Sequence, residues 1–236
     1  MIDSVGTFPR LEKLYMLRLG AGELSKPIRV EAPNLRDVSL LYNSLQPWKT
    51  ALPWAQLTTL RLESDLYTCW EILSYTSNLE VLTMYTENQG SGISSSNRVF
   101  NNLVDRSGFT LRKLHLRLRD TLGGVSKGFL QMKSLESVQD LTLVGPTGGT
   151  DDLNELFELM SRRVNICLPA LEHLCIEECA PAYAEICQLV NMLIARVDCA
   201  EGCTQLKSFK FSFSERGDGN RNNFATAGSC LPRRCW

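Results

Sequence analysis

The hydrophobic residues of this chain recur in a short pattern, L-x-x-L-x-L, whose first, fourth and sixth positions are apolar. The first four copies begin 21 or 22 residues apart, and the later copies begin 27 to 35 residues apart. Because successive residues of a strand face opposite sides, each copy predicts a short strand that turns its apolar positions toward a core. The apolar positions of the copies are Leu14, Leu17 and Leu19; Leu35, Val38 and Leu40; Leu57, Leu60 and Leu62; Leu79, Leu82 and Met84; Leu111, Leu114 and Leu116; Val138, Leu141 and Leu143; Leu171, Leu174 and Ile176; and Leu206, Phe209 and Phe211.

A single strand of this kind cannot bury its apolar residues, whereas strands stacked side by side bury them together. The pattern and its period are typical of the leucine-rich repeat. Segment 35–45 matches the longer consensus L-x-x-L-x-L-x-x-[N/C]-x-L in full, with Asn43 at the polar turn position that Cys179 holds in a later copy. We therefore predict an α/β fold, a leucine-rich-repeat solenoid (horseshoe) with a parallel β-sheet on the concave face and helices on the convex face.

Apolar residues with helical spacing lie between several of these strands. Leu66, Cys69, Trp70 and Leu73 recur at i, i+3, i+4 and i+7, and segment 153–160 repeats that spacing. The clearest predicted helix follows Pro181 and runs to residue 197. We place an N-terminal stub at 1–10 and about eight irregular repeats at 11–214, with a flexible insertion at 88–98 and a disordered tail at 215–236.

The repeats explain why 37 of the 236 residues are leucine, and the rest of the composition limits the partners. Lys and Arg number 25 against 26 Asp and Glu, so the net charge of -1 gives no overall positive field for nucleic acid or an anionic membrane. The first ten residues lack a secretory signal, and the apolar stretch 186–195 is too short to cross a bilayer. Nine scattered cysteines favour reduced thiols. We expect a cytoplasmic or nuclear monomer that binds neither nucleic acid nor membrane.

Two cysteine pairs have the spacing C-x3-C, namely Cys175 with Cys179 and Cys199 with Cys203. Each pair resembles half of a zinc site, which needs four ligands that converge on one point. The repeat register turns Cys175 outward on a strand and Cys179 inward, so the first pair does not converge. We expect reduced core or surface thiols and no metal.

Catalysis by a nucleophile needs a base beside it, and the chain has only two histidines. His115 and His173 fall on outward strand positions in different repeats, and we interpret both as surface residues. The adjacent carboxylates Glu177 and Glu178 are expected to diverge, because neighbours on a strand point to opposite faces. We therefore expect no enzyme activity and no cofactor.

Four segments of the repeats share a theme in which a turn leads into the leucine pattern, namely 32–38, 52–62, 72–82 and 168–174. They resemble the irregular leucine-rich-repeat region of fungal F-box proteins, particularly those of mushroom-forming (basidiomycete) fungi, over about residues 11–213. That resemblance implies a substrate receptor of a cullin-RING ubiquitin ligase. In such a receptor an N-terminal F-box binds the ligase adaptor, and the repeats capture a target protein.

The sequence departs from this family at its N-terminus, because nothing before Leu11 could hold an F-box. We therefore expect the ligase adaptor as a partner only if an F-box lies upstream. The chain is then either a fragment or mispredicted gene product, or a repeat protein that binds its partner without ubiquitin chemistry. An unidentified enzyme or a nucleic-acid binder on the same scaffold is the alternative from another class.

In leucine-rich repeats the outward strand positions line the concave face, which offers a broad surface to a protein partner. Tyr and Arg are enriched among the residues that contribute most to binding at interfaces. Our hypothesis is that a partner with an acidic and apolar surface docks there, the alternative for each residue being an ordinary solvated strand position. The candidate protein-binding residues are Arg18, Tyr42, Arg61, Tyr85, His115 and Arg117.

Overall fold

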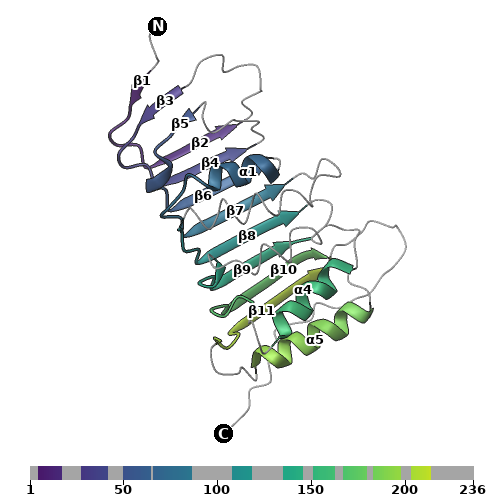
Figure 1. Cartoon of the computed structure of the whole chain (residues 1–236). Coiled ribbons are helices and arrows are strands. Elements are labelled where there is room, and N and C mark those ends of the chain that lie inside the picture. Colours follow the sequence, from purple (N-terminus) through teal and green to yellow (C-terminus); the bar gives the residue numbers. More distant parts are fainter. Residues whose placement is uncertain are drawn as a thin grey trace, which may run out of the picture.

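The computed structural model describes residues 5–17, 28–41, 50–64, 66–86, 108–118, 135–145, 151–162, 167–179, 183–197 and 203–213. Eight of its strands form one parallel sheet in the order β11-β10-β9-β8-β7-β6-β4-β2, so that each strand lies beside the next one along the chain (Figure 1). The α/β solenoid of the leucine-rich-repeat kind that the sequence predicts is confirmed. The strands are β2 (Lys13–Leu17), β4 (Asp37–Leu41), β6 (Thr59–Ser64), β7 (Val81–Thr86), β8 (Lys113–Leu118), β9 (Asp140–Val144), β10 (His173–Cys179) and β11 (Ser208–Phe213).

Three helices lie on one face of this sheet, and they confirm the three helices predicted from apolar spacing (Figure 1). They are α1 (Leu66–Leu73), α4 (Asp151–Ser161) and α5 (Tyr183–Val197). None of the described helices covers the opposite face of the sheet, which we call the open face. The strand side chains that face the helices pack into one continuous core with α1, α4 and α5.

A second, three-stranded parallel sheet lies at the N-terminal end and consists of β1 (Val5–Thr7), β3 (Ile28–Glu31) and β5 (Thr50–Ala51). Each of these strands precedes a strand of the large sheet by a short turn, and a 3-10 helix, η2 (Trp54–Gln56), lies in the last of these turns. The earliest repeats therefore carry a short strand where the sequence predicts helices. Residues 5–7, which we assigned to a stub, pair with β3.

One carbonyl in front of each strand holds the repeats in a constant register. The carbonyl oxygen of Thr58 accepts the backbone N–H groups of Glu80 and Val81, and the carbonyl oxygen of Glu80 accepts those of Arg112 and Lys113. The same two-for-one arrangement recurs between every neighbouring pair of repeats in the described part of the large sheet. Because each turn is tied to its neighbour, a longer connection elsewhere in a repeat leaves the strand pairing unchanged.

The register of the first repeat differs from the sequence interpretation. Leu14 pairs with Val38, and Met16 pairs with Leu40, so this copy of the pattern begins at Leu11 rather than at Leu14. Leu17, which we expected to face the core, is 55% exposed on the outward side. The sequence favoured the other register because three leucines at 14, 17 and 19 fit the consensus better than a copy that ends in Met16. The pairing between strands decides the register, and the sequence pattern carries no information on that pairing.

A buried arginine fastens α5 to the rest of the solenoid. Arg196 is 2% exposed, and its guanidinium donates hydrogen bonds to the carbonyl oxygens of Met160, Cys167 and Leu168. Met160 lies in the last turn of α4, where carbonyl groups lack helical partners and the helix dipole favours a cation. Burial lowers the pKa of Arg196. The side chain thus joins α5, the end of α4 and the segment that leads into β10.

Candidate functional site

The in-register strands align the outward side chains of the open face into straight rows. Neighbouring strands of a sheet lie about 4.8 Å apart, so side chains of one row contact each other across strands. One row contains Tyr15, Ser39, Arg61, Thr83, His115, Thr142, Cys175 and Lys210, and the next contains Leu17, Leu41, Glu63, Tyr85, Arg117, Val144 and Glu177.

Four of the six candidate residues lie together in these rows, and we call them the β6–β8 cluster: Arg61, Tyr85, His115 and Arg117. The guanidinium carbon of Arg61 lies 4.9 Å from the centre of the Tyr85 ring, which is the geometry of a cation–π contact. The Tyr85 ring also contacts the ring of His115, with ring centres 5.6 Å apart. Arg117 follows His115 by two residues on β8 and faces the same side.

The remaining two candidates, Arg18 and Tyr42, lie outside the described residues. The corrected register also changes what the first repeat contributes. Tyr15, rather than Arg18, pairs with Ser39 in the row that contains Arg61. Tyr15 is 59% exposed, so the open face continues toward its N-terminal end with an aromatic residue.

His115 is half-buried, and its environment favours the neutral imidazole. Burial lowers its pKa below the ordinary value of 6.5, Arg61 and Arg117 lower it further, and Glu177 acts in the opposite direction. Its Nε2 atom is inaccessible to water and makes no hydrogen bond to any described residue. A buried polar atom without a partner is uncommon and calls for an explanation. Here it leaves one ring nitrogen unused in the middle of the cluster.

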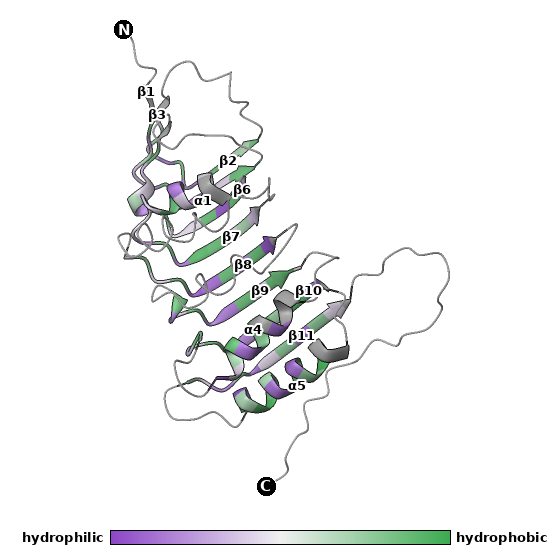
Figure 2. Cartoon of the chain, turned by 45° about the vertical axis from the view of Figure 1, so that its right-hand side comes forward, coloured by the Kyte–Doolittle hydropathy of each residue, from purple (hydrophilic) through white to green (hydrophobic). Residues whose placement is uncertain are grey.

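Arg117 forms an ion pair with Glu178, with 2.8 Å between Nη2 and Oε2. The pair joins β8 to β10 across β9, where Val144 pairs in register with Arg117 on one side and with Glu177 on the other. In Figure 2 the C-terminal end of β8 is coloured hydrophilic, whereas the C-terminal end of β9 is coloured hydrophobic. The expectation that Glu177 and Glu178 diverge is wrong. The register of β10 shifts between Ile176 and Cys179, and this irregularity brings both carboxylates to the open face.

Glu177 forms a second set of contacts that sequence reasoning missed. Its Oε1 atom lies 2.9 Å from Nζ of Lys210 and 3.3 Å from Sγ of Cys175. The hydrogen bond from Lys210 lowers the pKa of Glu177, and the one from Cys175 adds to this effect. Burial and the contact with Glu177 raise the pKa of the Cys175 thiol, which keeps its proton at neutral pH. The sequence signal that could have indicated these contacts was the outward strand position of Cys175 and Lys210.

Several cations on the open face form ion pairs with carboxylates, whereas Arg61 does not pair with any described carboxylate. Lys13 lies 3.4 Å from Asp37, and Lys113 lies 2.9 Å from Asp140. Arg117 and Lys210 are paired as described above. Arg61 makes no ion pair with any described residue, and the contact that defines its position is the Tyr85 ring. Within the β6–β8 cluster, Arg61 is therefore the cation with the least compensation.

The second histidine lies apart from the cluster. His173 is exposed on β10, where its Nδ1 atom lies 2.7 Å from Oγ of Ser208. Its Nε2 atom lies 3.9 Å from carboxylate oxygens of Asp140 and of Glu172. As predicted, the two histidines occupy outward positions on different strands, and only His115 contacts candidate binding residues.

The cysteines differ in state. Cys69, Cys167, Cys175 and Cys187 are reduced thiols, and burial raises the pKa of Cys167 to about 11. Cys203 is disulfide-bonded, so the expectation of a reduced thiol is wrong at this position. Within the described ranges no three His, Cys, Asp or Glu side chains gather closely enough to hold a metal ion, and no helix is long and apolar enough to span a bilayer.

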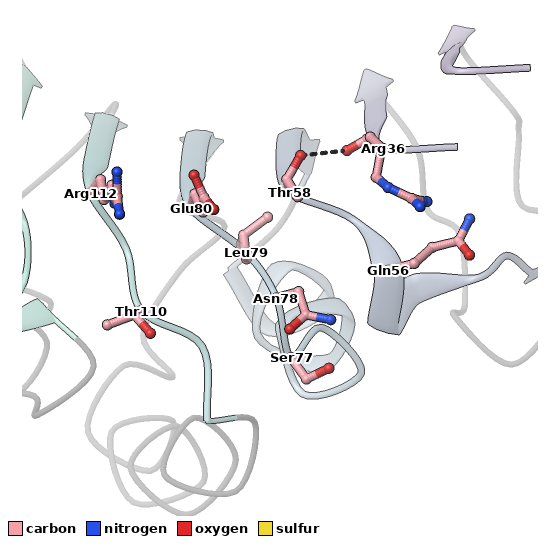
Figure 3. Close-up of a pocket in the computed structure, with 9 residues that line it drawn as sticks. All are labelled: Arg36, Gln56, Thr58, Ser77, Asn78, Leu79, Glu80, Thr110 and Arg112. Carbon is pink, nitrogen blue, oxygen red and sulfur yellow. Dashed lines mark hydrogen bonds between the residues drawn. The ribbon is translucent and has the colours of Figure 1, made fainter. Parts of the chain in front are cut away.

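A polar groove of about 440 Å³ lies where the chain enters four strands of the sheet (Figure 3). Its walls are formed by Arg36, Gln56, Thr58, Ser77, Asn78, Leu79, Glu80, Thr110 and Arg112. Several of these side chains hold neighbouring repeats together. Asn78 and Ser77 donate to the carbonyl oxygen of Ala55, Gln56 donates to that of Leu35, and Thr58 donates to that of Arg36. These contacts give the groove a structural explanation, and it contains none of the candidate binding residues.

No known protein family matches the chain, and comparison with curated proteins and with solved structures finds no match either. The interpretation of the site therefore depends on the residues described above.

Proposed function

We propose that this protein is a non-catalytic interaction module that binds a partner protein on the open face of its sheet. The observation that carries this proposal is the β6–β8 cluster. Tyr85 contacts both Arg61 and His115 on a face that no described helix covers. Arginine and tyrosine in contact are typical of the few residues that dominate the free energy of binding at interfaces.

The rigidity of the scaffold supports the same function. The cluster residues lie on three neighbouring strands whose backbones are fixed by ladder hydrogen bonds on both sides. A partner that binds there finds its contact residues already in place, so little conformational entropy is lost on binding.

We further propose that the module is the substrate-recognition region of an F-box-type receptor of a cullin-RING ubiquitin ligase. This finer proposal is supported by the resemblance of four repeat segments to fungal F-box proteins. The ligase adaptor would bind through an F-box and the target through the open face.

Affinity capture with a charge-reversed variant tests the general proposal. Wild-type protein and the double variant R61E/R117E are used as baits, and the captured proteins are identified by mass spectrometry. We expect partners of the wild type to be lost from the double variant, because reversed charges at a cluster impose like-charge repulsion. Recovery of the ligase adaptor and cullin on a bait extended upstream to include an F-box tests the finer proposal.

The control is R162E, immediately after α4. Arg162 is exposed and paired with Glu158, and its reversal changes the net charge by half as much as the double variant does, on the helix-covered side. Partners bound to R162E and lost from R61E/R117E bind at the cluster. The proposal is contradicted if every captured protein binds the double variant as strongly as the wild type.

A further inference from the structure

The carboxylate on Arg117 comes from an unusual place in the backbone. Glu178 has a φ of 56°, in the left-handed region that is unfavourable for a residue with a Cβ atom. It lies within the irregularity of β10, which re-aims side chains relative to a regular strand. Backbone conformations of this kind persist only where the surrounding structure holds them, and they concentrate at functional sites. In this case the conformation places a carboxylate on a guanidinium two strands away.

The ion pair between Arg117 and Glu178 is one in which another carboxylate can replace that of Glu178. Its two side chains are 51% and 49% exposed, and exposed pairs of this kind contribute little net free energy because water competes for both charges. A carboxylate brought by another molecule therefore replaces Glu178 at small cost. Arg61 lies on the same side of the sheet and provides a further contact for the incoming segment.

We propose that Glu178 is an internal stand-in for an aspartate or glutamate of the partner, whose extended acidic segment displaces Glu178 from Arg117 and also contacts Arg61. This inference rests on the proposed function and adds the chemistry of the partner. Arg61 and Arg117 lie two strands apart and are offset by two residues along the strands, or roughly 12 Å, which an extended segment spans in about four residues. Because side chains of an extended segment alternate between its two faces, the segment carries two acidic residues four positions apart, which point to the same face.

The test uses a short fluorescent peptide with two glutamates four positions apart, flanked by alanine and leucine. A second peptide has glutamine at both positions, and a third has phosphoserine. Fluorescence anisotropy measures their dissociation constants for wild-type protein, E178Q and E158Q. Glutamine keeps the size of residue 178 and removes only its charge. Glu158 on α4 is also in an exposed ion pair, with Arg162, so E158Q is the matched control.

We expect the wild type to bind the glutamate peptide and to bind the glutamine peptide more weakly. E178Q should bind the glutamate peptide roughly two- to five-fold more tightly, the range of an exposed ion pair, whereas E158Q should behave as the wild type. The double variant R117Q/E178Q should lose this gain, because the carboxylate of the peptide then has no guanidinium at position 117.

The outcomes separate this inference from the proposed function. If E178Q binds no more tightly than the wild type while R61E/R117E abolishes binding, the open face is the binding site but Glu178 is not a stand-in. Equal tightening toward the glutamate and glutamine peptides also overturns the inference, because it reports a general loosening of β10. Binding of the phosphoserine peptide alone overturns the choice of carboxylate, and binding of none of the peptides overturns the inference altogether.

Discussion

The N-terminal and C-terminal halves of the solenoid differ in the segments that connect their strands, whereas the pairing of the strands is the same in both. From β2 to β7, neighbouring strands begin 22 to 24 residues apart, and β3, β5 and α1 lie between them in sequence, while β1 precedes β2. From β8 to β11 the strands begin 27 to 35 residues apart, and the helices α4 and α5 are inserted. Strand pairing nevertheless continues in register from one half into the other. Extra residues therefore enlarge the connections and leave the open face unchanged.

The β6–β8 cluster lies across the boundary between the halves. Arg61 and Tyr85 belong to the closely spaced repeats, and His115 and Arg117 belong to the first widely spaced strand. Their contacts depend on continuous pairing rather than on either half alone. The large sheet is thus one scaffold that is covered by different elements in its two halves.

The largest effect is expected from removing a core leucine in either half. Leu60 on β6 and Leu141 on β9 are 0% and 1% exposed. Replacement of either by alanine removes a buried side chain and leaves a cavity, so each variant should lose about 3 kcal/mol of unfolding free energy. Urea unfolding followed by circular dichroism measures both. A loss at Leu141 of less than a third of that at Leu60 would show that the halves do not share one core.

A smaller and more local loss is expected from R196M. The variant leaves the carbonyl oxygens of Met160, Cys167 and Leu168 without their donor, which should cost about 2 kcal/mol. Hydrogen exchange should accelerate in α4 and α5 and stay unchanged in β6, because only the C-terminal half uses this contact. R162M, at an exposed arginine, is the control. Equal acceleration in β6 would mean that the halves unfold as one unit.

The next effect is a pH dependence of the unfolding free energy that comes from His115, which lies at the boundary between the two halves. Because burial lowers the pKa of His115 in the folded state, the unfolded chain binds its proton more readily. Stability is therefore full above pH 6.5, the ordinary pKa of histidine, and decreases as the pH falls from 6.5 through the lower folded pKa.

Thermal unfolding at several pH values measures this dependence. The variant H115Q should lose less stability between pH 7 and pH 5 than the wild type, since it lacks the titrating group. H173Q serves as the control at the exposed histidine. The assignment fails if H115Q and the wild type show the same loss over this interval.

The smallest effects are expected from matched surface ion pairs in the two halves. Lys13 pairs with Asp37, and Lys113 pairs with Asp140, in each case between in-register residues of neighbouring strands. K13A and K113A should each change the unfolding free energy by less than about 1 kcal/mol, because exposed pairs contribute little. A loss at Lys113 comparable to that of a core leucine would show that the wide repeats depend on their charges.

The sequence was sufficient for the sheet and for most of the cluster. The pattern of apolar positions fixes which residues of a strand face outward, so Arg61, Tyr85, His115 and Arg117 could be placed on one face. The spacing of apolar residues likewise predicted α1, α4 and α5. These are local periodicities, and each is repeated several times, which reduces the effect of any single irregular position.

The features that the sequence did not predict depend on pairing between strands. Leu14 fits two registers of the pattern, and only its pairing with Val38 distinguishes them. Glu178 reaches Arg117 because of an irregularity in β10 that no local pattern signals. The polar residues before the first leucine of some repeats, such as Asn78, were a usable signal, since Asn78 donates to the carbonyl of the preceding repeat.

The central claim is that a partner docks on the open face across the boundary between the two halves. Hydroxyl-radical footprinting of the protein with and without a captured partner tests it directly. The account predicts slower oxidation of Tyr85 and His115 in the complex, with no change at Tyr75, which is 47% exposed just beyond α1. Protection of Tyr75 together with unchanged oxidation of Tyr85 and His115 would contradict the account.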